Sequence, residues 1–148
     1  MARNGFNLDE VREFFKKKQI SIKRQYDESS EKIVRDLYLK LLAETPKDKG
    51  RTLAGWNISW GSPQMDVPEN LVTRQRATLG EKVAAHAQIL ARKKNDMSRA
   101  LSDFDERFSK GEVLHIRNYT EYIFELEFGG HSNQAPNGWI RINIAKLK

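Results

Sequence analysis

Apolar residues in the first 45 positions recur at spacings that predict a long helix. Five of them are separated by four or seven residues, and they therefore lie on one helical face. They are Ile22, Tyr26, Ile33, Leu37 and Leu41. We expect either one long helix or two helices with a break near Gln19.

Both ends of this predicted helix have local signals. Asn7 is a candidate N-cap, and Glu10, three residues later, is placed to reach back to the Asn7 backbone. At the other end, Pro46 disfavours helical geometry in Thr45, which precedes it. We therefore expect the helix to span most of residues 1–45.

A turn, a strand and a loop are predicted next. Residues 47–50 have turn chemistry, with Gly50 free to adopt a positive φ. Residues 53–60 alternate as in a strand, and residues 61–78 have no steady period, which indicates an exposed loop. The large apolar side chains of the strand share one side: Trp56, Ile58 and Trp60.

A second helix is predicted from Leu79 to about Leu90. Its apolar face would carry Val83, Ala87 and Leu90. The pattern leaves open whether this helix continues towards Phe108.

The last third of the chain favours strands. Residues 113–117 are expected to pair with residues 122–126, and residues 139–147 alternate apolar and polar positions. Gly129 and Gly130 on one side and Asn137 and Gly138 on the other bracket a small loop. The predicted fold class is α+β, with a long N-terminal helix and a second helix packed on a small, mainly antiparallel β-sheet. We expect a single domain over 1–148, composed of a helical arm (1–45) and an α+β body (46–148).

Composition limits the range of functions. The chain has 148 residues, no cysteine, and 26 basic against 20 acidic residues, a net charge of +6. No disulfide or thiol chemistry is available, and no apolar run is long enough to cross a membrane. The basic excess lies mainly in the first 51 residues, in a cluster with nucleic-acid-binding potential. Its members are Lys16, Lys17, Lys18, Lys23 and Arg24. The interleaved acidic residues favour a solvated helix face instead.

Candidate catalytic and metal-binding groups are weak. His86, His115 and His131 have no ligand-like spacing, and we expect no metal, cofactor or enzymatic activity. Glu125 and Glu127 would share one face of a strand, where a structural ion pair is favoured over acid–base chemistry. The candidate partners of Glu127 are Arg51 and Arg141, and we expect Glu127 to anchor the segment from Gln134 to Arg141. Several aromatic residues of the body favour core and subunit contacts over base-stacking platforms. They are Trp56, Trp60, Tyr119, Tyr122, Phe124, Phe128 and Trp139.

Three short motifs, in order, carry a resemblance to a known family. The first comprises residues 45–51, the second runs from Asn118 and Tyr119 to Glu127 and Gly129, and the third comprises residues 134–141. Together they resemble the minor tail, tail-completion or neck proteins of long-tailed bacteriophages (the lambda-like Z protein and its relatives). That family more often has a helix-like segment where residues 139–147 alternate.

The resemblance implies a structural virion protein without catalysis. It implies a homo-oligomeric ring, with six copies favoured and twelve as the alternative, that joins the head connector to the tail or completes the tail. Its neighbours would be connector, tail-terminator or tail-tube proteins, with DNA passing through the lumen without sequence-specific binding. The protein would be made in the host cytoplasm and reside in the neck. The expected subunit or partner contacts are Asp48, Arg51, Trp56, Trp60, Tyr122, Glu127, Gln134, Pro136, Trp139 and Arg141. The alternative function is nucleic-acid binding through the N-terminal basic cluster.

Overall fold

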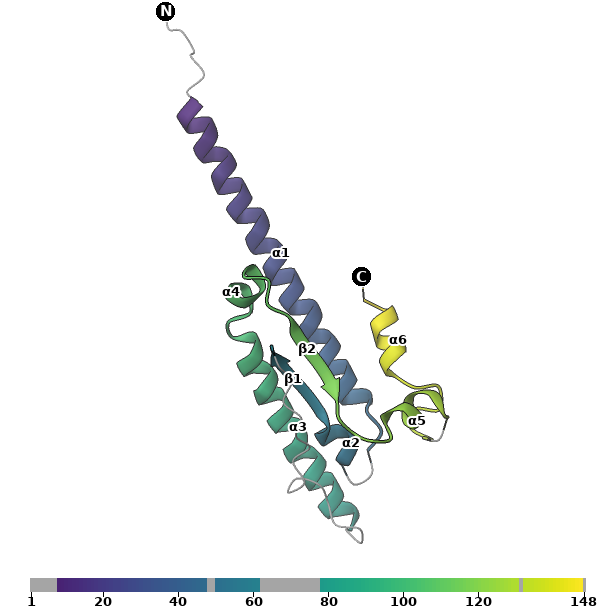
Figure 1. The fold of residues 1–148 in the computed structure, drawn as a ribbon. Coiled ribbons are helices and arrows are strands. Elements are labelled where there is room, and N and C mark those ends of the chain that lie inside the picture. The colour runs from purple at the N-terminus through teal and green to yellow at the C-terminus, as the bar shows by residue number, and fades with distance from the viewer. Residues whose placement is uncertain (1–7, 48–49, 62–77, 131, 148) are drawn as a thin grey trace, which may run out of the picture.

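The computed structural model describes residues 8–47, 50–61, 78–130 and 132–147. Figure 1 shows one long helix beside a small sheet, with shorter helices around them. The elements in chain order are α1 (Leu8–Glu44), α2 (Arg51–Ala54), β1 (Trp56–Trp60), α3 (Leu79–Leu101), α4 (Phe104–Ser109), β2 (Leu114–Asn118), α5 (Ile123–Phe128) and α6 (Ile140–Ala145).

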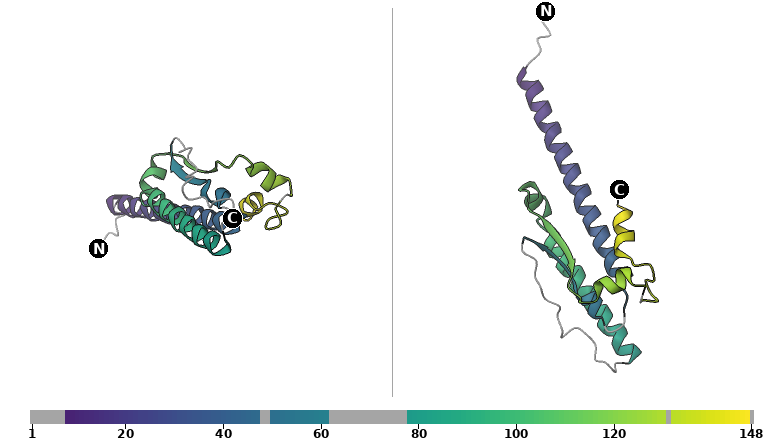
Figure 2. Two further views of the ribbon diagram at one scale, coloured as in Figure 1. Left: turned by 90° about the horizontal axis from the view of Figure 1, so that it is seen from below. Right: turned by 45° about the vertical axis from the view of Figure 1, so that its right-hand side comes forward.

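The sheet consists of β1 and β2 in antiparallel register. Trp56 lies opposite Asn118, Ile58 opposite Ile116, and Trp60 opposite Leu114. β1 packs against α3, which itself contacts α1, so the sheet lies on a pair of long helices (Figure 2). The α+β class predicted from the sequence is confirmed.

Helix α1 is continuous through Gln19 and ends at Glu44, as one of the two alternatives predicted. Its C-terminal part enters the core through Tyr38, Leu41 and Leu42, because this part faces α3, α4 and α6. Its N-terminal part projects beyond the body (Figure 1). The predicted cap at Asn7 lies outside the described residues.

The core is formed where α1, α3 and the sheet meet. Trp56 and Ile58 of β1 are buried, whereas Asn57 and Ser59 are only half-buried, which confirms the predicted sidedness of this strand. The remaining large buried side chains come from other elements: Tyr38, Leu41, Leu42, Leu53, Ile89, Met97, Leu101, Phe104 and Trp139.

The predicted N-terminal extension of β1 is wrong. Residues 51–54 form the one-turn helix α2, and the strand begins only at Trp56. Gly50, with φ of 87°, reverses the chain before α2, as predicted. A β-carbon at Gly50 would lie 2.7 Å from Ile89 Cδ1, so α2 packs directly on α3. The predicted loop over 61–78 lies almost wholly outside the described residues.

Helix α3 begins with a capping box, in which Thr78 and Glu81 exchange side-chain-to-backbone hydrogen bonds. It continues past Leu90, where the sequence pattern left its course open, and ends at Leu101. The predicted apolar face is only partly right, since Leu90 packs against the core but Val83 and Ala87 are exposed. The buried face instead carries Ile89, Lys93, Met97 and Leu101, because α1, α2 and β1 all pack on that side.

The predicted pairing in the last third is also wrong. β2 pairs with β1, which is far away in sequence, and residues 123–128 form helix α5 rather than a strand. Residues 140–145 form helix α6, again not a strand. The hydrogen bonds that favour α6 come from Glu127, as described below.

Candidate assembly interface

Two segments 87 residues apart are joined just beyond the end of α1. The backbone N–H of Lys47 donates to Gln134 Oε1 at 2.8 Å, and Gln134 Nε2 donates to the carbonyl oxygen of Lys47 at 2.8 Å. The amide of Gln134 thus satisfies both backbone groups of one residue, as a neighbouring strand would. This pair connects the first and third motifs of the sequence.

Glu127 connects the second and third motifs. Its carboxylate accepts backbone N–H groups from Trp139 (2.8 Å), Ile140 (3.0 Å) and Arg141 (2.9 Å). Arg141 Nε donates to the same carboxylate at 3.1 Å. We call Glu127 and the three N–H groups it binds the latch. The prediction that Glu127 pairs with Arg141 and anchors this segment is confirmed.

The latch also explains why α6 is helical. The first N–H groups of a helix have no intrahelical partner, and α6 has no local side-chain cap. Glu127, twelve residues before Trp139, satisfies those groups from another helix. We expected Glu125 and Glu127 to share one face of a strand. This expectation is wrong, because both residues lie on the helix α5.

The environment of Glu127 favours its charged form. Its side chain is 4% exposed. Burial by itself raises the pKa of a carboxyl group, but the hydrogen bonds from Arg141, Trp139 and Ile140 outweigh it and lower the pKa of Glu127 below its usual value. The carboxylate is therefore a structural anion near neutral pH.

Gly138 allows the close approach that the latch needs. Its φ is 77°, and a β-carbon there would lie 2.4 Å from the carbonyl oxygen of Glu127 and 2.7 Å from its carboxylate. Only glycine meets both conditions without displacement of Glu127.

Further buried polar contacts, which the sequence analysis missed, complete this end of the body. Trp56 Nε1 donates to Thr45 Oγ1 at 2.8 Å, and Asn143 Nδ2 donates to Glu44 and to the carbonyl oxygen of Trp139. Asn143 occupies one of the polar positions of the alternating segment, so nothing in the local pattern distinguishes it as buried.

Helix α5 presents an exposed aromatic surface. Phe124 and Phe128 are 71% and 59% exposed, and their rings stack with centroids 6.1 Å apart. The guanidinium of Arg141 lies 4.2 Å from the centroid of Phe128. Glu121, three residues before Phe124, and Glu125, directly after it, are also exposed. We call Glu121, Phe124, Glu125 and Phe128 the α5 face.

The projecting part of α1 also presents exposed aromatic residues. Phe14 and Phe15 are 58% and 61% exposed, with Lys18 Nζ 6.0 Å from the ring of Phe14. Val11 lies one turn before them. Lys16, Lys17 and Lys18 are all exposed, whereas the side chains of Lys23 and Arg24 lie outside the described part of the chain.

The remaining predicted contact residues differ in their exposure. Trp56 and Trp139 are buried in the core of the subunit, so neither ring is available as a stacking platform. Trp60 is half-buried, and its indole N–H donates to the carbonyl oxygen of Ala100 at 2.7 Å. Tyr122 and Pro136 are exposed and Arg51 is half-buried, whereas Asp48 lies outside the described residues.

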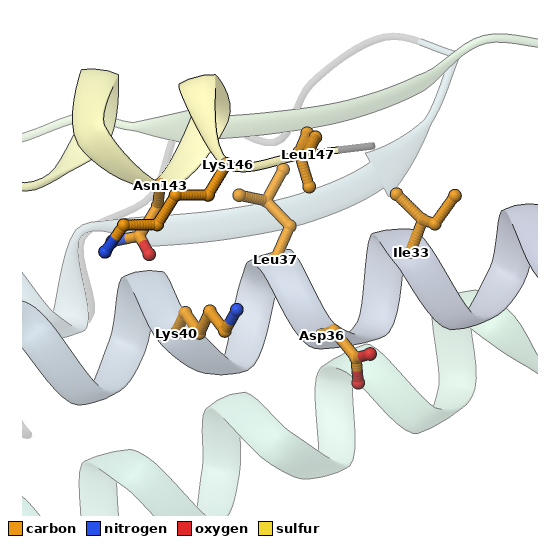
Figure 3. A pocket seen from close by; sticks show the side chains of 7 residues that line it. All are labelled: Ile33, Asp36, Leu37, Lys40, Asn143, Lys146 and Leu147. Atoms are coloured by element: carbon orange, nitrogen blue, oxygen red, sulfur yellow. The ribbon is translucent and has the colours of Figure 1, made fainter.

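The hollows found on the described surface measure from about 160 to about 370 Å³. Figure 3 shows one of about 160 Å³ between α1 and α6, where Leu37 rises from α1 beside Leu147, with Lys40 and Lys146 nearby. Another is lined by residues of the Lys47–Gln134 junction. Among the described residues, no group of His, Asp or Glu side chains is arranged to hold a metal ion. His86 and His115 lie apart from the latch, and His131 is outside the described residues.

No helix within the described ranges has the length and apolar character needed to cross a membrane. Comparison of the chain with protein-family models, with curated proteins and with solved structures finds no match.

Proposed function

We propose that this protein is a structural subunit of the neck of a long-tailed bacteriophage, and that it joins the tail to the head connector or completes the tail. It works as a ring subunit around the DNA channel, with six copies favoured over twelve. It is made in the host cytoplasm, resides in the virion, and contacts connector, tail-terminator or tail-tube proteins.

One observation carries this proposal. The three motifs that resemble the phage family converge at one end of the body, where their polar groups bind backbone atoms. Glu127 binds three N–H groups, and Gln134 binds both backbone groups of Lys47. The polar atoms of Glu127 and Gln134 are therefore used to hold loops in place and are not directed at a substrate.

The surface beside these motifs supports the same proposal. Exposed aromatic and aliphatic side chains gather on α5 and α6, including Phe124, Phe128, Ile142 and Ile144. Exposed apolar groups concentrated on neighbouring elements are typical of protein interaction sites. A scaffold of locked loops beside an apolar surface suits an assembly subunit better than an enzyme.

Native mass spectrometry tests the proposal, with the purified protein at moderate and high salt, alone and with double-stranded DNA. A ring of six or twelve copies that ignores DNA supports it. Capture of DNA that is lost steeply as salt rises contradicts it and supports nucleic-acid binding through the lysines of α1.

A second measurement applies if the protein is monomeric and ignores DNA. Purified protein is added to phage particles that lack this subunit, and infectious particles are counted. Restored infectivity supports the neck function, and no restoration contradicts it.

A further inference from the structure

The projecting part of α1 presents one face whose composition is mainly apolar. Val11, Phe14, Phe15 and Lys18 follow the spacing i, i+3, i+4, i+7, which aligns them along a helix. We call these four residues the arm face. At 100° per residue, Asp9 and Glu13 fall on other sides of α1, whereas Glu10 lies one turn before Phe14 at the edge of the arm face. Lys18 is the charged member of the arm face, beside the ring of Phe14.

The α5 face has the complementary composition. Phe124 and Phe128 lie four residues apart on α5, and their rings are accompanied by the exposed carboxylates of Glu125 on the helix and Glu121 in the turn before it. The arm face thus combines aromatic rings with a cation. The α5 face combines aromatic rings with two carboxylates, beside the guanidinium of Arg141, which is bonded to Glu127. If the two faces packed together, aromatic rings would contact aromatic rings, and Lys18 would lie near a carboxylate.

The two faces of one chain lie too far apart to meet. Lys18 and Glu44 are separated by 26 residues of unbroken helix, a rise of about 39 Å. The α5 face lies near the end of α1 at Glu44, since α6, held by the latch, bonds to Glu44 through Asn143. Figure 1 shows α5 beside the C-terminal end of α1, far from the N-terminal end of that helix. The faces can therefore meet only between two copies.

We propose that the arm face of one copy docks on the α5 face of the next copy. Because two different surfaces meet, the contact is heterologous, and repeated contacts close into a ring when the rotation between copies allows it. This inference rests on the proposed neck function and specifies how the ring is held together.

The size of the faces indicates a contact that is weak by itself. A Phe side chain of which more than half is exposed offers about 100 Å² for burial, so each face offers a few hundred Å². A stable pair of proteins buries about 800 Å² on each partner. Closure of a ring, in which each copy makes the contact twice, compensates for a weak single contact.

A mixing experiment with full-length chains tests this inference. One variant lacks the arm face (Phe14→Ser with Phe15→Ser), and the other lacks the α5 face (Phe124→Ser with Phe128→Ser). The control is Val83→Ser, an equally exposed apolar residue on α3. Circular dichroism confirms that each variant is folded, and analytical ultracentrifugation at high micromolar concentration measures association.

Each double variant alone should lose association by about 100-fold, because two aromatic anchors are removed. Mixed together, the two should form a one-to-one pair and nothing larger, because one intact arm face meets one intact α5 face. The Val83→Ser control should assemble like the parent.

Several results would overturn the inference. If only the arm variant loses association, the arms pair with each other. If only the α5 variant loses it, the α5 faces pair with each other. If the parent protein stays monomeric at high concentration, copies do not bind one another by these faces. None of these results decides the neck function, which the infectivity and DNA measurements test separately.

A charge exchange provides an independent check. Lys18→Glu and Glu125→Lys should each weaken association about threefold to tenfold, and the two changes made together in one chain should restore much of it. Equal weakening in the combined variant would exclude this pairing of Lys18 with Glu125.

Discussion

Replacement of Glu127 is the most informative perturbation of this fold. In Glu127→Ala, three backbone N–H groups and the Nε of Arg141 lose their acceptor. The N–H of Trp139 is buried, so water does not readily replace the lost carboxylate there. Loss of one partner of a buried charged network typically costs about 3–5 kcal/mol, and we expect a similar decrease in the free energy of unfolding.

Such a loss is a large share of the total stability. Domains of this size are stable by about 5–15 kcal/mol, and each kcal/mol corresponds to a few degrees in melting temperature. We therefore expect Glu127→Ala to lower Tm by roughly 10 to 15 °C, measured by calorimetry. The matched control is Glu125→Ala on the same helix, which removes an exposed carboxylate and should change Tm little.

The pH dependence gives the same test a second readout. The pKa of Glu127 in the folded protein is lowered from the ordinary value of 4.5. Its charged form therefore stabilises the fold above pH 4.5, and this stabilisation is lost as the pH falls through the lowered pKa. The difference in Tm between the parent and Glu127→Gln should be largest near neutral pH and should narrow progressively below pH 4.5. A variant that melts like the parent at neutral pH would refute the latch.

Three other substitutions test neighbouring features by thermal denaturation. Gly138→Ala should destabilise the protein by about 2 kcal/mol or more, because the backbone is left-handed there and the methyl group would overlap Glu127; an unchanged Tm would contradict this close approach. Burial lowers the pKa of Lys93, although Asp96 partly opposes the shift. Lys93→Met should therefore raise stability at neutral pH, and the parent should gain stability relative to this variant as the pH rises towards 10.5. Tyr38→Phe should be neutral or stabilising by up to about 1 kcal/mol, since its buried hydroxyl has no hydrogen-bond partner among the described residues, and clear destabilisation would reveal a partner.

Features governed by local chemistry could be predicted from the sequence. The stop of α1 before Pro46 and the positive φ of Gly50 follow from the backbone preferences of proline and glycine. The sidedness of β1 follows from the alternation of its residues, with Trp56 and Ile58 inward. Each of these features depends on residues within a few positions of the one in question.

Helix α6 could not be predicted in this way. Ile140, Ile142 and Ile144 alternate with polar residues, which locally favours a strand. The structure instead places Ile142 and Ile144 at the surface and joins the start of the helix to Glu127. A hydrogen-bond acceptor on another element thus overrides the local pattern, and no periodicity within 139–147 contains that information.

The same argument applies to the sheet and to α3. β2 pairs with β1 across more than fifty residues, while the nearer segment 122–126, which looked like a suitable strand, is part of the turn and helix that carry Glu127. On α3, Lys93 lies on the buried face and Val83 on the exposed one, because the packing of α1, α2 and β1 decides which side is covered. Apolar spacing alone does not identify that side.

Arg141 connects the interior of the subunit to its exposed surface. Its Nε donates to the carboxylate of Glu127, and its guanidinium lies over the ring of Phe128. A whole buried ion pair can often be replaced by apolar groups without loss of stability, so the presence of such a pair is by itself weak evidence for a role beyond the fold. In this chain the carboxylate of Glu127 also binds the guanidinium that lies over Phe128 of the α5 face.

This connection makes stability and assembly separable. Arg141→Met leaves the three backbone N–H bonds of the latch in place and removes the cation over Phe128. We expect Tm to fall by a few degrees at most, since Arg141 is largely exposed, while association between copies weakens about threefold to tenfold. Glu127→Gln should lower both Tm and the affinity between copies, because it weakens the backbone hydrogen bonds of the latch and the bond to Arg141 together. If Arg141→Met assembles like the parent, Phe128 does not depend on Arg141 for its position, and the latch serves the fold of the subunit alone.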